Sequence, residues 1–382
     1  MNFRQRFVNT MQFKTVDQIP CMDFGYWAET IERWHREGLP AECRSDSQVE
    51  DFLGLDRGYL PWRKDFDPQI EFNEVLYLEA NWLPYAGDVY PPFPAEMISE
   101  DENHTINRSP LGYIFRQNKG VQSMPEFLEF PVKNIADWEK IVPRLDGKNP
   151  ERYPANWDLK VEKYKISDQP LSLYISGFFG MARNMMGLEN LSFAYYDQPE
   201  LITAMAEHHA QFLMDAYDRV TTDLEIDFVV TFEDMCYNSG SLISPKLFQK
   251  FMSPYYSQIT RFFKDRGVKT LMVDTDGAVL EIMKLFLEAG MDGCLPCEVK
   301  AGSHPLALRA RYPGIRLMGG VAKTALMSDK TAIDAALNSL IPVMEEGGFI
   351  PTVDHEVPPE VSFANYRYFC DRRKELSAKY HP

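Results

Sequence analysis

The sequence predicts an α/β fold in which parallel strands close into a (β/α)8 barrel, and three observations support this prediction. First, short β-prone runs alternate with helical patterns from residue 170 onward, as in a parallel sheet with crossover helices. Second, polar residues follow nearly every β-prone run, where the catalytic face of such a barrel lies. Third, no G-x-G-x-x-G turn stands early in the chain, as a doubly wound dinucleotide-binding sheet would require.

The clearest strand–turn–helix unit lies at residues 269–290. The β-prone run 269–273 leads directly into Asp274 and Asp276, and a helical pattern of apolar residues follows over 279–289. Because side chains alternate along a strand, the two aspartates are expected to share one face. The strand therefore predicts a pair of carboxylates at its carboxyl end.

The second half of the chain contains six such units, and they are too evenly spaced for a sandwich of antiparallel sheets. The predicted strands are 171–176, 227–231, 269–273, 293–296, 315–318 and 348–353. The helices predicted after them lie around 182–186 and at 199–221, 246–266, 279–289, 304–311 and 331–346.

The first half is less regular, and we interpret it as the start of the same single domain, 1–382. Residues 1–19 predict a helix and a turn, and Ile19–Gly25 predicts the first strand, with Asp23 near its end. Residues 27–168 are expected to form an irregular excursion and helices packed around the barrel. Within it we expect short helices at 27–60, a proline- and aromatic-rich stretch at 61–100, a hairpin at 103–118 and amphipathic helices in 126–168.

Composition narrows the class of protein. A chain of 382 residues, 45% of them hydrophobic, can bury a large core. Its formal net charge is −16, so we expect no long-range attraction to nucleic acid or to an anionic membrane surface. No apolar run has the roughly 18 residues of a membrane span. Neither a signal peptide nor a disulfide-framework spacing of its six cysteines is apparent, so a reduced, cytoplasmic protein is expected.

Asp274, Asp276 and His355 are the first candidates for a site. Adjacent carboxylates can bind a metal, share a proton or orient a cationic group, although Asp276 before Gly277 can equally cap the following helix. His355 stands between two acidic residues, which raise the pKa of an imidazole, and prolines follow it and stiffen the loop. The alternative for His355 is a solvated loop histidine.

Further candidates follow other strands. Glu233 and Asp234 end the strand 227–231, so one carboxylate is expected to face the barrel mouth while the other caps a helix or pairs with a cation. Arg183 can bind a carboxylate or phosphate at a helix start, or form a plain salt bridge. Cys294 and Cys297 resemble half of a zinc site, but no second pair exists, which favours structural thiols.

Taken together, these strand ends resemble the uroporphyrinogen decarboxylase superfamily. The resemblance covers nearly the whole chain and implies a (β/α)8 barrel. The segments that carry it are 17–20, 23–34, 177–187, 196–201, 232–235 with 242–245, 273–277, and 354–359 with Asn365 and Tyr366.

The superfamily contains two activities. Its cofactor-free decarboxylases bind four acetate arms with an arginine-rich segment after the first strand. In this sequence the corresponding stretch begins Phe24-Gly-Tyr-Trp and has no arginine before Arg33, whereas Glu29 and Glu32 are present. A strongly anionic substrate would be repelled there, so the resemblance favours the other branch, the corrinoid-linked methyltransferases.

Thiol-methylating members of that branch bind zinc through His-x-Cys and a later Cys. Here Asp274-x-Asp276 is similar in placement to the His-x-Cys, and His355 stands near the later Cys. An Asp/Asp/His set can hold a divalent metal such as Zn, but it suits an oxygen or nitrogen atom better than a soft thiolate.

The resemblance thus implies a methyltransferase component that moves a methyl group from a small methoxylated or methylamine-type substrate to the corrinoid of a cobalamin-binding partner protein. The runner-up is a cofactor-free decarboxylase, and the third alternative is a non-catalytic ligand-binding barrel. A homodimer is also suggested. The catalytic candidates are Asp274, Asp276, His355 and Glu233, and the substrate-binding candidates are Asp23, Tyr26, Tyr174, Arg183, Asp234 and Glu298.

Overall fold

A computed structural model of the chain describes residues 1–56, 89–119, 125–153 and 155–382. Most of the proline- and aromatic-rich stretch predicted at 61–100 lies outside these residues, as does part of the predicted excursion at 27–168.

The main sheet has six parallel strands, and each lies where the sequence predicts one. Its order is β12-β11-β10-β9-β6-β5, so each strand pairs with its neighbours along the chain and the order never reverses. A doubly wound sheet would reverse its order at a switch point, whereas an α/β barrel does not. The fold is therefore the predicted α/β barrel type. The strands are β5 (Ser172–Ser176), β6 (Phe228–Phe232), β9 (Thr270–Asp274), β10 (Gly293–Cys297), β11 (Arg316–Val321) and β12 (Phe349–Val353).

The strand predicted at Ile19–Gly25 is not formed as a regular strand. The segment runs beside the end of β12, but its backbone makes a single parallel bridge, between Tyr26 and Val357. Its other anchors to this region include the Asp23 side chain, which accepts a hydrogen bond from the backbone N–H of Val353 at 3.1 Å. Side-chain bonds of this kind leave no periodic pattern in the sequence, so the ladder was wrongly expected there.

Helices follow the strands as predicted, but prolines divide two of them. The helix predicted at 246–266 is two helices, the second with Pro254 in its first turn, and the helix predicted at 331–346 is likewise divided, with Pro342 starting its second part. Proline lacks a backbone N–H, so it fits a first turn and not a helix interior. The divided helices are α10 (Pro245–Phe251) with α11 (Ser253–Asp265), and α15 (Lys330–Ser339) with α16 (Ile341–Glu346).

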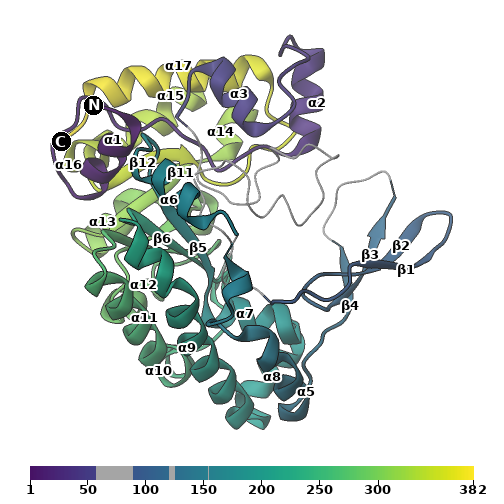
Figure 1. Ribbon diagram of the computed structural model, residues 1–382. Coiled ribbons are helices and arrows are strands. Elements are labelled where there is room, and N and C mark those ends of the chain that lie inside the picture. The colour runs from purple at the N-terminus through teal and green to yellow at the C-terminus, as the bar shows by residue number, and fades with distance from the viewer. Residues whose placement is uncertain (57–88, 120–124, 154) are drawn as a thin grey trace.

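The remaining α-helices surround the sheet. Figure 1 shows α9 to α13 along one part of it, and α14, α15 and α17 close to α2 and α3. These helices are α1 (Phe3–Met11), α2 (Ala28–Arg36), α3 (Asp46–Leu53), α5 (Ile135–Ile141), α6 (Trp157–Lys165), α7 (Phe178–Met186), α8 (Leu188–Asp197), α9 (Pro199–Asp223), α12 (Met283–Glu288), α13 (Pro305–Arg311), α14 (Lys323–Met327) and α17 (Phe363–Lys379).

A separate four-stranded antiparallel sheet projects from the body of the protein (Figure 1). The hairpin predicted at 103–118 is confirmed as its two middle strands, which pair from His104 opposite Asn118 to Arg108 opposite Ile114. Its strands are β1 (Glu96–Glu100), β2 (His104–Arg108), β3 (Ile114–Asn118) and β4 (Glu126–Glu129), and a short hairpin of β7 (Cys236–Tyr237) and β8 (Gly240–Ser241) follows β6.

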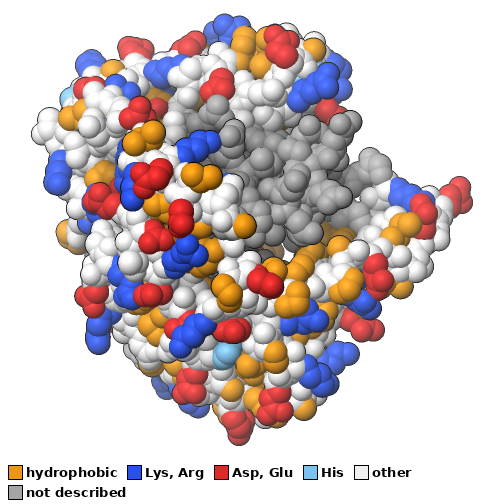
Figure 2. Space-filling view, viewed as in Figure 1, with side chains coloured by type: hydrophobic (Ala, Val, Ile, Leu, Met, Phe, Trp, Pro, Cys, Tyr) orange, Lys and Arg blue, Asp and Glu red, His pale blue; other side chains and the backbone are white. Residues whose placement is uncertain are grey.

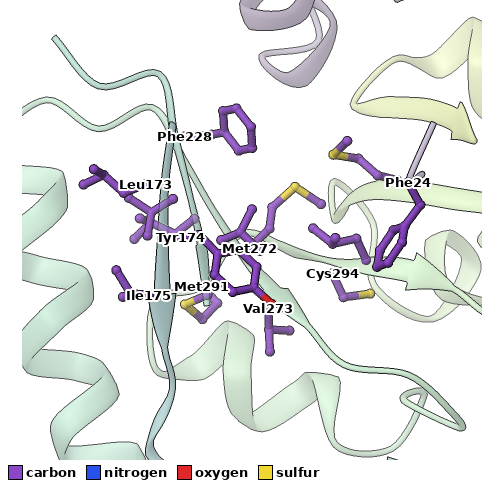
Figure 3. Close-up of a cluster of buried hydrophobic side chains, with 14 of the residues drawn as sticks. Phe24, Leu173, Tyr174, Ile175, Phe228, Met272, Val273, Met291 and Cys294 are labelled. Atoms are coloured by element: carbon purple, nitrogen blue, oxygen red, sulfur yellow. The ribbon is translucent and has the colours of Figure 1, made fainter. Parts of the chain in front are cut away.

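The hydrophobic core contains side chains from neighbouring strands of the main sheet. Figure 3 shows Leu173, Phe228, Met272 and Cys294, from four neighbouring strands, together with Phe24 of the N-terminal segment, and all five are buried. Apolar burial of this kind supplies most of the stabilisation of a domain. On the face shown in Figure 2, acidic and basic side chains are interspersed.

In the part of the chain that the structure describes, every helix is too short or too polar to traverse a lipid bilayer.

A buried ion pair joins the N-terminal segment to the last helix. Arg373 of α17 donates from Nη1 and Nη2 to the two carboxylate oxygens of Asp23 at 2.7 and 2.8 Å, and both side chains are 0% exposed. Tyr366 donates to the same carboxylate at 2.6 Å. These contacts satisfy two charges in a region from which water is excluded.

We expect Arg373→Met to lower the free energy of unfolding by about 3–5 kcal/mol, because it leaves the Asp23 charge buried without a cationic partner. Urea denaturation measures the change. The matched control is Arg372→Met, at the next position of the helix, whose ion pairs with Asp334 and Glu375 lie at the surface and should matter little. Equal stability of the two variants would contradict this account of the pair.

Candidate active site

The carboxyl ends of the parallel strands bring most of the predicted site residues to one face of the sheet. The pairing register places Phe232 of β6 and Leu295 of β10 on either side of Asp274, at the end of β9. The residues after these strand ends therefore meet above the core, as expected for an α/β barrel.

Asp276 and His355 form a pair across this face. The Nε2 atom of His355 lies 3.5 Å from Oδ2 of Asp276, and the two side chains are 27% and 34% exposed, respectively. Phe24 stacks on the imidazole with a centroid distance of 5.6 Å. Burial lowers the pKa of His355, but the hydrogen bond and the charge of Asp276 raise it by more, so the net shift is upward. The pair can hold a proton at a solvent-accessible position.

Asp274 lies deeper than Asp276. Its side chain accepts a hydrogen bond from the hydroxyl of Tyr174 at 3.0 Å, and the residue is 5% exposed. Burial and the nearby charge of Asp276 raise the pKa of Asp274 well above its ordinary value, which favours the neutral acid. Asp274, the last residue of β9, and Asp276, in the loop after it, thus occupy different environments, although they stand two residues apart.

Glu233 is fully buried beneath the face, where it caps α7. Its carboxylate accepts hydrogen bonds from the backbone N–H groups of Phe178 at 3.0 Å and Gly180 at 2.6 Å, and from the Tyr256 hydroxyl. Burial raises its pKa to about 7 against the lowering effect of these bonds. A Cβ atom at Gly177 would lie 2.2 Å from the Glu233 carboxyl carbon, so only glycine fits beside it. These contacts give Glu233 a structural role at the start of the helix.

Asp234 and Arg183 pair with each other at the rim. Arg183 Nη1 donates to the Asp234 carboxylate at 2.6 Å and to its backbone carbonyl at 2.9 Å. Asp234 has a φ of +44°, an uncommon conformation for a residue with a side chain, and the two bonds from Arg183 hold it there. Of the two interpretations of Arg183, the salt bridge is the one the structure contains.

Asp23 and Tyr26 do not reach the candidate site. Asp23 is committed to Arg373, and the Tyr26 hydroxyl lies 2.9 Å from that of Tyr366, with both Asp23 and Tyr26 0% exposed. These contacts give both residues a structural role, and the substrate-binding role expected from the sequence stays a prediction. Their partners stand about 340 to 350 residues away along the chain and leave no local signal in the sequence.

Sequence reasoning missed Lys323 and the placement of Asp354. Lys323 Nζ lies 3.3 Å from Oε1 of Glu298, which was predicted to bind substrate, and the backbone N–H of Lys323 donates to Asp354 at 2.8 Å. Burial raises the pKa of Asp354. A lysine at a helix start looks like an ordinary surface residue in the sequence, so only its place after β11 could have indicated it.

The donor set does not assemble as a metal centre. Within the described residues no group of three or more His, Cys, Asp or Glu side chains is placed to hold a metal ion. The set Asp274, Asp276 and His355 therefore does not form such a group either. Cys294 and Cys297 are buried free thiols. Proton transfer is the chemistry that these side chains can supply themselves.

The fold and this face together define an α/β barrel protein with a carboxylate–imidazole pair at the carboxyl ends of its parallel strands. The chain belongs to the uroporphyrinogen decarboxylase family, because the family model described as "Uroporphyrinogen decarboxylase (URO-D)" matches residues 111–376. No curated protein matches the chain.

The chain is similar to two solved structures to different extents. A methyltransferase from Methanosarcina mazei is similar over 98% of this chain and 99% of its own, with 14% sequence identity and a TM-score of 0.59. At that identity the similarity shows the shared fold. A vitamin-B12 independent methionine synthase structure from Listeria monocytogenes covers 57% of this chain and 65% of its own, with 13% identity and a TM-score of 0.33.

The contact between Asp276 and His355 predicts a specific pH dependence. The pKa of His355 is raised above its ordinary value of 6.5, so the protonated pair stabilises the fold below that pH, and this stabilisation is lost as the pH rises through the folded-state value. We expect Asp276→Asn to lower the pKa of His355, since the hydrogen bond and the opposite charge of Asp276 are lost. NMR titration of the imidazole measures it. The buried His209 should not respond, and an unchanged His355 would show that the two groups are not coupled.

Proposed function

We propose that the protein is a methyltransferase component that moves a methyl group from a small methoxylated or methylamine-type substrate to a corrinoid carried by a partner protein. The observation that carries the proposal is the Asp276–His355 pair at the strand ends, a proton donor at the position where an α/β barrel handles its substrate. The fold shared with the Methanosarcina mazei methyltransferase over 98% of the chain also supports it.

Removing a methyl group from a methoxylated compound requires a proton donor. When a methyl group leaves a methoxylated compound, the departing oxygen keeps the bonding electrons and needs a proton to become a stable alcohol or phenol. The corrinoid supplies the nucleophile that accepts the methyl group. The protein's own task is to hold the substrate, exclude water and protonate the leaving oxygen.

His355 fits the role of general acid. Asp276 engages its Nε2 atom, and no described residue hydrogen-bonds to Nδ1, which leaves that nitrogen to face a substrate. The stacked ring of Phe24 fixes the plane of the imidazole. Asp276 stabilises the protonated ring and keeps it oriented, as a carboxylate orients the histidine of a hydrolase triad. Asp274, held by Tyr174 and favoured in its neutral form, is a second proton donor below the pair.

Asp276→Ala and His355→Ala should each lower methyl transfer at least about 10²-fold, the usual contribution of a general acid. The assay follows methylcobalamin formation from reduced cobalamin with methoxylated aromatic and methylated amine donors. The control is His104→Ala, on the projecting sheet, and thermal melting should stay unchanged because the paired side chains are partly exposed. Wild-type rates in both site variants would show that the pair only caps its loops. Tight ligand binding without turnover in the unaltered protein would favour a non-catalytic barrel.

The runner-up, a cofactor-free decarboxylase, is favoured by the name of the matching family. Its substrate carries four acetate arms, yet the segment after residue 23 has no arginine before Arg33, and Arg33 is engaged by Glu37 and by the carbonyl of Pro359. We therefore expect no sustained conversion of uroporphyrinogen to coproporphyrinogen. Incubation with product analysis decides, and steady turnover would establish the decarboxylase instead.

A further inference from the structure

The loop that carries Asp276 is held at its next residue, Gly277. The backbone N–H of Gly277 donates to Oε2 of Glu298, after β10, at 2.9 Å, and Ser303 donates to its carbonyl at 2.7 Å. Gly277 has a φ of +84°, and a Cβ atom there would lie 2.8 Å from the backbone of Cys236. Only glycine satisfies both conditions. The position of Asp276 is thus coupled to that of Glu298.

The loop that carries His355 is held through Asp354 in a comparable way. Asp354 accepts hydrogen bonds from the backbone N–H of Lys323 at 2.8 Å and from that of Val299 at 3.2 Å. The side chain of Lys323 turns back to Oε1 of Glu298 at 3.3 Å. One chain of bonds therefore links the ends of β9, β10, β11 and β12, and its two ends are the neighbours of the reactive pair.

We propose that Glu298 and Lys323 are positioning residues that hold Asp276 and His355 at their observed separation. The inference rests on the proposed function only in treating that pair as the proton-handling groups. Both carboxylate oxygens of Glu298 are used, one for the backbone beside Asp276 and one for Lys323, so removing the carboxylate frees both ends of the chain of bonds.

The competing account is a solvated ion pair of little consequence. Glu298 and Lys323 are 19% and 29% exposed, and ion pairs that water can reach contribute little to stability. Their direct charges act on His355 in opposite directions, with Lys323 lowering its pKa and Glu298 raising it. Their combined electrostatic effect is therefore small, and geometry is the effect that separates the two accounts.

Crystal structures of three variants test the proposal without any turnover assay. Glu298→Ala removes both bonds of the Glu298 carboxylate, and Lys323→Met removes the side-chain bond between Lys323 and Glu298, whereas the backbone bonds to Asp354 remain in both variants. The separation between His355 Nε2 and Asp276 Oδ2 should then grow beyond about 4 Å, the limit of an ion pair. Glu298→Gln keeps an acceptor for the Gly277 N–H and should preserve the 3.5 Å separation. If Glu298→Ala does not fold, Lys323→Met still removes the side-chain bond between Lys323 and Glu298.

A second readout comes from the imidazole ¹⁵N resonances of His355, assigned by their loss in His355→Gln. They should move toward their positions in Asp276→Asn when Glu298→Ala or Lys323→Met is introduced, but not in Glu298→Gln. The matched control is Lys284→Met, which breaks an exposed ion pair with Glu288 on α12. Unchanged resonances and an unchanged separation in both severing variants would overturn the proposal, whether or not methyl transfer is detected.

Discussion

The arrangement of this protein depends on how carboxylates are accommodated at the ends of buried strands. A charge removed from water without compensation costs several kcal/mol, so each buried acid needs a partner or a proton. Asp23 has a bidentate arginine, Glu233 has two backbone N–H groups and a tyrosine, and Asp354 has two backbone N–H groups. Asp274 has Tyr174 and a raised pKa that favours its proton. These compensations tie α17, α7, α14 and the strand ends into one frame.

Asp276 and His355 differ from these buried acids because both side chains are partly exposed. Asp276 shares a strand end with Asp274, yet one is 34% exposed at its side chain and the other is almost fully buried. Environments that differ this much between neighbouring groups are how one site holds a stable proton and an exchangeable one together. Both residues are aspartates, so their different roles arise from how deeply each side chain is buried.

The alternation of strands and helices predicts the six parallel strands, since each unit carries its own periodicity. The two divided helices differ from the prediction because Pro254 and Pro342 fall inside the predicted ranges but stand in the first turn of a second helix. Interactions between distant segments leave no such trace. The role of Asp23 depends on Arg373, and the segment Ile19–Gly25 is anchored partly through side chains, so neither could be predicted locally. The same reason applies to Lys323, whose bond to Glu298 exists only once β10 and β11 lie side by side.

The pairing of charges also bears on which chemistry of the family this chain performs. Arg183, Lys323 and His355 lie at the strand ends, and each is paired with a carboxylate: Asp234, Glu298 and Asp276. A substrate with several carboxylate arms would have to displace those partners and leave the displaced acids beside its own negative charges, which is unfavourable at a partly buried site. A neutral methoxylated compound or a methylated amine requires no such exchange. The electrostatics of the described strand ends therefore agree with methyl transfer better than with decarboxylation of a polyanion.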